Sequence, residues 1–124
     1  MGYEYFVVRC VPRVDREEFC NVGVVLYSHE AGYLAARCDV RPDRLRAVDP
    51  DLDLDAVGAA VGVIEAVCRG DVAAAGPAAS GTTRSRFGWL AAPRSTVVQP
   101  GPVHGGVTAD PAAELAHLVD RLVR

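Results

Sequence analysis

Residues 3–40, YEYFVVRCVPRVDREEFCNVGVVLYSHEAGYLAARCDV, contain three segments in which apolar side chains alternate at the period of a β-strand. These segments are Tyr3–Val11, about Asn21–Ser28 and Tyr33–Val40. The tetrapeptide His29–Gly32, between the last two, has the length of a hairpin turn. Tyr3–Val11 is largely apolar on both faces, which favours a central position. The three segments together predict an antiparallel sheet.

Helical patterns follow the third strand. A short helix is predicted over Pro42–Val48, because proline is favoured in a first turn. A longer amphipathic helix is predicted over Leu54–Arg69, with acidic residues before it and Gly70 as its stop. Its apolar face consists of Leu54, Val57, Val61, Ile64 and Cys68. The last helix is predicted to open at Asp110-Pro111, an N-cap followed by proline, and to bury Leu115, Leu118, Val119 and Leu122.

The whole chain, residues 1–124, is short enough to form a single domain. A fourth strand is predicted over Ser95–Gln99, between two prolines. Gly70–Thr83 lacks periodicity and is predicted to be a mobile loop. We therefore expect an α+β fold in which two main helices pack on one face of an antiparallel sheet of about four strands.

Composition excludes several classes of function. The formal net charge is −3, whereas nonspecific binding to nucleic acid or to a membrane surface needs an excess of cations. Four scattered cysteines, three scattered histidines and no glycine-rich phosphate loop predict neither a metal site nor a cofactor. No signal peptide or membrane-length apolar run is present, so we expect a cytoplasmic protein with reduced thiols.

The stretch Arg84–Asp110 concentrates residues with binding chemistry, including the only tryptophan. Arg94 is followed by the hydroxyls of Ser95 and Thr96, a combination suited to clamping a phosphate or a carboxylate. His104 lies among prolines and glycines, where its imidazole could be displayed as a general base. The alternative is a strand or turn in which Arg94 pairs with an aspartate and His104 bonds to the backbone.

A second candidate group lies between the first two predicted strands. Here Arg16 is expected to pair with Glu18 or Glu17 and to present Arg13 to an anionic ligand, while Asn21 bonds to backbone or ligand. The alternative is a solvated loop, whose surface ion pairs are each worth less than about 1 kcal/mol. The anion-binding hypothesis requires both groups to face one shared pocket.

Two parts of the chain resemble a known family. YEYFVVRCVPRVDREEFCNVGVVL, Tyr3–Leu26, resembles the opening of the bacterial family of unknown function numbered 3037. RFGWLAAPRSTVVQ and HGGVTAD, within Arg86–Asp110, resemble its closing block. Members of this family are often encoded beside HipA-like kinases, which implies an accessory or regulatory role. The resemblance implies no catalytic residue.

Two hypotheses follow. The favoured one is a noncatalytic accessory module that docks on a partner protein, plausibly a HipA-like kinase, or on a second copy of itself as a homodimer. It predicts an exposed apolar patch that includes Trp89. The alternative is a small enzyme or ligand-binding domain that recognises a phosphorylated or carboxylate ligand through Arg94, Ser95, Thr96 and His104.

Overall fold

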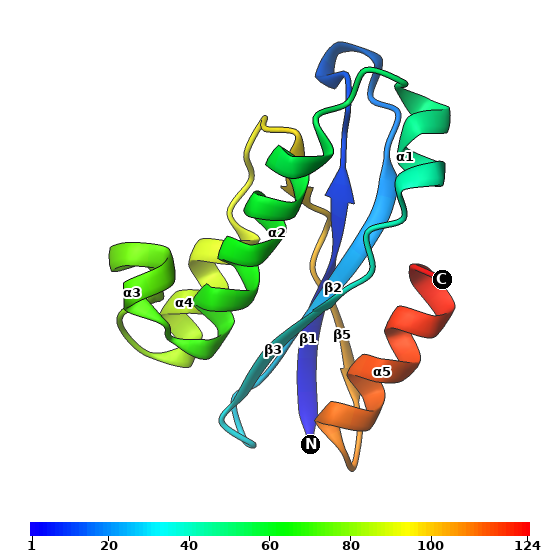
Figure 1. The fold of residues 1–124 in the computed structure, drawn as a ribbon. Coiled ribbons are helices and arrows are strands. Elements are labelled where there is room, and N and C mark those ends of the chain that lie inside the picture. The colour runs from blue at the N-terminus through cyan, green and yellow to red at the C-terminus, as the bar shows by residue number, and fades with distance from the viewer.

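The computed structural model describes residues 1–124 and shows an α+β protein (Figure 1). Its strands are β1 (Gly2–Cys10), β2 (Cys20–Ser28), β3 (Tyr33–Cys38), β4 (Val98–Pro100) and β5 (His104–Val107). Its helices are α1 (Pro42–Val48), α2 (Leu54–Arg69), α3 (Val72–Ala75), α4 (Thr83–Ala91) and α5 (Pro111–Leu122). Two 3-10 turns, η1 (Val14–Arg16) and η2 (Gly76–Ala79), complete the elements. The α+β class and the antiparallel sheet are confirmed.

β1 is the centre of the sheet. It pairs with β2 along one edge, and β2 pairs with β3. Its other edge pairs with β4 at Val8–Cys10 and with β5 at Gly2–Tyr5. β4 overlaps the end of the predicted fourth strand, Ser95–Gln99, whereas β5 was not predicted. The chain leaves the ladder between them because proline at Pro102 has no N–H to donate.

The two main helices cover opposite faces of the sheet, not one face as predicted (Figure 1). Phe6, Val8 and Cys10 of β1 pack under α2 and α4. On the other face, Val24 and Leu26 of β2 pack against α5. Because β1 and β2 are apolar on both faces, a single helical layer would leave half of this surface in water.

The predicted helix ends are confirmed. Asp53 caps α2 by accepting a hydrogen bond from the Ala56 N–H at 3.1 Å. Gly70 closes the same helix at φ 71°, a left-handed conformation that glycine adopts without strain. Asp110 caps α5 in the same way, through the Ala113 N–H at 3.2 Å. Local capping chemistry therefore determines where both helices begin.

The region from 70 to 91 differs from the prediction. The expected loop Gly70–Thr83 contains α3 and η2, and α4 was not predicted. Only Phe87 and Leu90 of α4 are buried, so its sequence shows little helical periodicity. The Thr82 hydroxyl starts α4 by accepting from the Ser85 N–H at 3.1 Å. None of the helices combines the length and apolar character required to cross a bilayer.

Candidate functional site

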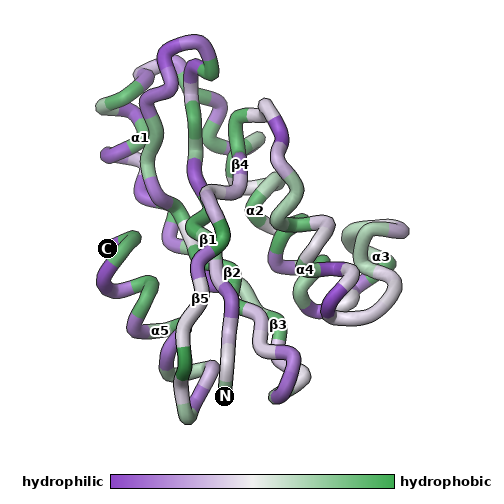
Figure 2. The backbone as a smooth tube through the Cα atoms, turned by 180° about the vertical axis from the view of Figure 1, so that it is seen from behind, coloured by the Kyte–Doolittle hydropathy of each residue, from purple (hydrophilic) through white to green (hydrophobic).

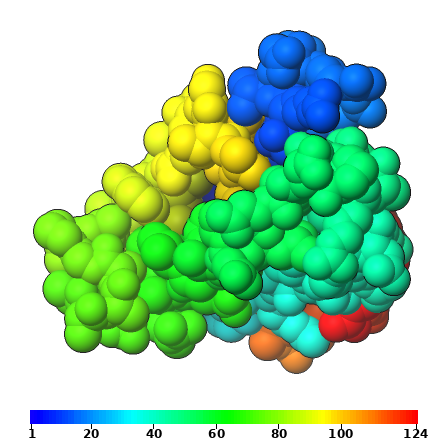
Figure 3. All heavy atoms as spheres, turned by 45° about the horizontal axis from the view of Figure 1, so that its top comes forward, coloured from blue at the N-terminus to red at the C-terminus, as the bar shows by residue number.

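An apolar pocket of about 540 Å³ lies between α2, α4 and the segment that leads into β4. In Figure 3 the hollow lies between green α2 and the yellow segment before β4. Its walls come from Pro12, the start and one side of α2, Trp89, Arg94 and residues 96–98. The pocket forms where α2, which packs on one face of the sheet, lies next to the segment that leads into β4, which pairs with the edge of β1.

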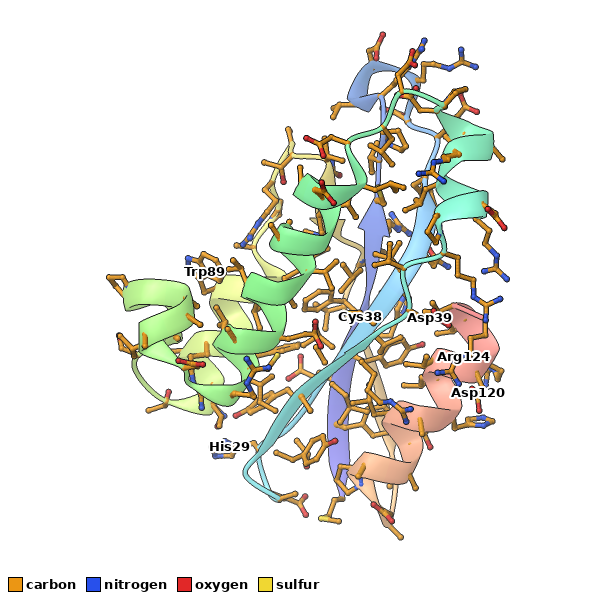
Figure 4. The ribbon with its side chains drawn as sticks, in the orientation of Figure 1. His29, Cys38, Asp39, Trp89, Asp120 and Arg124 are labelled. Carbon is orange, nitrogen blue, oxygen red and sulfur yellow. The ribbon has the colours of Figure 1, made fainter.

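Three large apolar side chains at this pocket are exposed: Val63 of α2 (38%), Trp89 of α4 (42%) and Val97 (38%). Trp89 is placed there by its helix, because Phe87 and Leu90 face the core and Trp89 projects outward (Figure 4). Val63 likewise lies outside the buried face of α2. We call the lining formed by these three residues the apolar wall.

Arg94 lies over the apolar wall. Its guanidinium carbon is 4.7 Å from the centroid of the Trp89 ring, a cation–π geometry. Its Nη2 donates to the Trp89 carbonyl and its Nε donates to the Ala92 carbonyl at 3.3 Å. Arg94 forms no ion pair. It therefore satisfies carbonyls at the C-terminus of α4, and this local role accounts for its position.

The opposite end of the pocket is acidic. Asp49, Asp51 and Asp53 all line it. Asp49 is buried, accepts from the Asp51 N–H at 3.0 Å and lies 3.8 Å from the Nε of Arg13. Asp51 and Asp53 are exposed and have no cationic partner. The two unpaired aspartates therefore outnumber Arg94, the one arginine that lines the pocket.

The candidates between β1 and β2 are mostly engaged within the chain. Arg16 pairs with Glu18, as predicted, and both are exposed. The Nδ2 of Asn21 donates to the Leu122 carbonyl at 3.0 Å, so it satisfies the end of α5. Only Arg13 borders the pocket, through Asp49. The β1–β2 connection, hydrophilic over much of its length in Figure 2, holds most of these residues away from the apolar wall.

The candidates within Arg84–Asp110 do not converge. Arg94 and Thr96 line the apolar pocket, whereas Ser95 lines a smaller one. Thr96 donates to the Val98 carbonyl at 2.7 Å. His104 belongs to β5 and packs against Tyr5, with ring centroids 5.4 Å apart. The expectation that these residues share one pocket is therefore not met.

Three of the four cysteines are poor nucleophiles. All four are free, and burial raises the pKa of Cys10 to about 11 and the pKa of Cys38 and Cys68 to about 12. These three remain thiols at neutral pH and cannot attack as thiolates. The structure contains no cluster of three or more His, Cys, Asp or Glu side chains that could hold a metal ion.

The sequence analysis did not identify the aspartates that line one end of the apolar pocket or the position of Val63 in its wall. The aspartates before α2 were interpreted as a favourable helix start, which is correct for Asp53. Their spacing around Leu52, an apolar residue that also lines the pocket, was the available signal. Asp–x–Asp flanking an apolar residue indicates a surface of mixed character, and only the packing of β4 opposite α2 turns that surface into a pocket.

An α+β protein with an antiparallel sheet and a concave apolar site is the class that these observations define. Residues 5–123 match the family described as "Protein of unknown function (DUF3037)", and the chain belongs to this family. No curated protein and no solved structure matches the chain.

Proposed function

We propose that this protein is a binding module that receives a short apolar segment of a partner protein in the pocket between α2 and β4. The segment carries Lys or Arg beside its apolar anchor. The observation that supports this proposal most strongly is the apolar wall, three large exposed side chains around one concavity, next to two unpaired aspartates.

The apolar wall supplies the favourable free energy. Burying a large apolar side chain completely is worth roughly 1.5–3 kcal/mol. Val63, Trp89 and Val97 are 38–42% exposed, so a partner that covers all three gains roughly 2–3 kcal/mol. Tryptophan is also the residue type most enriched where binding energy concentrates at protein interfaces. Arg94, stacked on Trp89, extends the same surface with a planar group that tolerates desolvation.

The charge at the mouth determines which segment is preferred. Asp51 and Asp53 have no cationic partner within the chain, and Asp55 continues the acidic run along the first turn of α2. A basic residue beside the anchor would pair with these carboxylates, whereas an acidic residue would be repelled. Such rim charges contribute more to specificity and association rate than to affinity.

The resemblance described above implies a bacterial setting and a HipA-like kinase as the first partner to test, and we propose a cytoplasmic location. In this proposal the module docks on the kinase through one apolar-basic segment and acts as an accessory protein. A second copy of the chain is the other occupant that the test can reveal, since a homodimer would cover the same apolar wall.

The experiment is peptide display against the immobilised protein, with random twelve-residue peptides. We expect the recovered peptides to share an apolar or aromatic anchor followed or preceded by Lys or Arg. The Val63→Arg variant should lose these peptides, whereas Val72→Arg, at an exposed helical valine outside the pocket, should retain them. Recovery of unrelated peptides, or equal binding to Val63→Arg, would refute the proposal.

A small anionic ligand in the same pocket is the second candidate. Arg94 and Thr96 both line it, and Arg94 has no carboxylate partner. The aspartates at the mouth oppose it, because they repel an approaching phosphate or carboxylate. Phosphate-dependent thermal stabilisation that disappears in Arg94→Ala would favour this alternative over the peptide site.

A further inference from the structure

A smaller pocket of about 360 Å³ lies where β1, β4 and the β1–β2 connection meet. Arg9 of β1 lines it together with Ser95, Gln99 and Phe19. Arg9 alternates along β1 with Val8 and Cys10, which pack under α2, so its side chain leaves the opposite face of the sheet. This pocket is therefore separate from the apolar wall, with residues 94–97 between the two.

The guanidinium of Arg9 is held on two sides. Its Cζ lies 4.2 Å from the centroid of the Phe19 ring. On the other side is the backbone of Gly101, where a Cβ atom would come within 3.1 Å of the Arg9 Nε and 3.2 Å of its Cζ. A side chain at position 101 would therefore crowd the Arg9 guanidinium. The arginine is therefore pre-oriented, and a ligand would have little side-chain freedom to remove.

Arg9 nevertheless has no acceptor within the protein. Its Nε is buried without a hydrogen-bond partner, and none of its nitrogen atoms takes part in an ion pair. By contrast, Arg86 and Arg94 both donate to backbone carbonyls, although the Nε of Arg86 is also buried without a partner. A partly buried guanidinium without an acceptor is unfavourable unless something outside the chain supplies one.

Two neutral groups complete a donor set around Arg9. Gln99 is its register partner in the antiparallel pairing of β1 with β4, so the two side chains leave the same face of the sheet as neighbours. Ser95 precedes β4 and points into the same pocket. We infer that this pocket binds a small oxyanion, a carboxylate or a phosphate monoester, through the planar fork of Arg9, with Ser95 and Gln99 as further donors.

The other residues that line the pocket indicate what kind of ligand it accepts and how Glu17 affects binding. Phe19 (45% exposed) and Val14 (42%) provide an apolar surface for the body that carries the anionic group. Glu17 also lines the pocket, has no ion-pair partner and adopts the left-handed backbone conformation, at φ 58°. Its carboxylate competes with an incoming anion for Arg9, so the occupied pocket requires Glu17 to lie aside.

The test uses phenyl phosphate, benzoate and neutral benzyl alcohol as probes, with two-dimensional NMR of the ¹⁵N-labelled protein. We expect phenyl phosphate, benzoate or both to shift the Arg9 Nε–H resonance in a saturable way, while benzyl alcohol does not. Binding by only one anion identifies the ligand as phosphate or carboxylate. Equal shifts with benzyl alcohol, or no shift with either anion at millimolar concentration, would overturn the inference.

Variants separate a specific site from general charge attraction. Arg9→Met should weaken anion binding by about tenfold or more, and Ser95→Ala, at an exposed residue, by about threefold to tenfold. Glu17→Gln should strengthen it. Arg37→Met, at an exposed strand arginine that also lacks an ion pair, should leave it unchanged. If Ser95→Ala and Glu17→Gln both bind as the parent does, the pocket does not bind the anion.

Discussion

Asn21 illustrates how a polar residue at a strand end can serve the fold. Its amide reaches the Leu122 carbonyl, one of the carbonyls that α5 leaves without a helical partner. We expect Asn21→Ala to lower the free energy of unfolding by about 1 kcal/mol, because a partly buried carbonyl loses its donor. Urea unfolding measures the change. Arg16→Met, which breaks an exposed ion pair in the preceding connection, should cost clearly less.

Because of its buried thiols, the protein should lose stability as the pH rises into the alkaline range. Burial raises the pKa of Cys68 to about 12 from a reference value of 9.0, so the unfolded chain ionises this thiol first. The contribution of the thiol is complete below pH 9 and is lost as the pH rises toward 12. Between pH 9 and pH 12 the thiol ionises only in the unfolded chain, and this should lower the free energy of unfolding by about 1 kcal/mol per pH unit. Urea unfolding at pH 8, 9.5 and 10.5 should show a shallower decline in Cys68→Ala than in the parent protein; equal slopes would contradict this account.

At the scale of the element, Arg86 connects α4 to the end of α2 through hydrogen bonds. Its Nη1 donates to the carbonyls of Val67 and Cys68, at 2.9 and 3.0 Å. Arg86→Met should therefore lower the free energy of unfolding by about 1–3 kcal/mol, the range for hydrogen bonds from a charged donor. Arg84→Met is the matched control, because Arg84 lies on the same helix, is exposed and makes no hydrogen bond. A similar loss in both variants would show that the capping contacts contribute little.

The end of α5 is tied to the end of β3 by a charged contact. Arg124 donates to Asp39 at 3.1 Å and to Asp120 at 2.9 Å, and the three side chains lie together in Figure 4. The hydrogen bond from Arg124, followed by that from Arg41, lowers the pKa of Asp39. The stabilisation is therefore complete above the ordinary aspartate pKa of about 3.9 and is lost as the pH falls through the lower folded value.

For this reason Asp39→Asn should destabilise the protein at pH 7 and should approach the stability of the parent as the pH falls from 4 to 2. Thermal unfolding across this range measures the difference. Asp43→Asn, at an exposed aspartate of α1 without an ion pair, should show no such convergence. A difference for Asp39→Asn that persists unchanged at pH 2 would show that the contact does not carry the effect.

At the scale of the whole molecule, features that depend on local sequence were predicted correctly, whereas features that depend on long-range packing were not. The bounds of α1 and α2 are as predicted, because proline, Asp53 and Gly70 mark their ends chemically. The side of the sheet that each helix covers depends on long-range packing, which periodicity does not report. The α4 helix was missed because only Phe87 and Leu90 face the core.

The candidate site was predicted only in part for the same reason. The exposed position expected for Trp89 follows from its place on α4, and Arg94 and Thr96 do lie at one pocket. The wall opposite them comes from Val63 and the aspartates before α2, more than thirty positions away along the chain by the printed numbering. The sequence alone could not show that this wall lies near Arg94, because that follows from the pairing of β4 with β1. The separation of Ser95 from Arg94 likewise depends on the direction of each side chain.

The central claim is that the pocket between α2 and β4 binds an apolar segment flanked by basic residues. Trp89, the only tryptophan of the chain, is a direct reporter because it stands half-exposed at that pocket. The measurement is its fluorescence emission during titration with the tightest peptide from display, itself free of tryptophan. The account predicts a saturable blue shift, weakened when Asp51 and Asp53 are both changed to Asn. Saturating binding that leaves the Trp89 emission unchanged would contradict it.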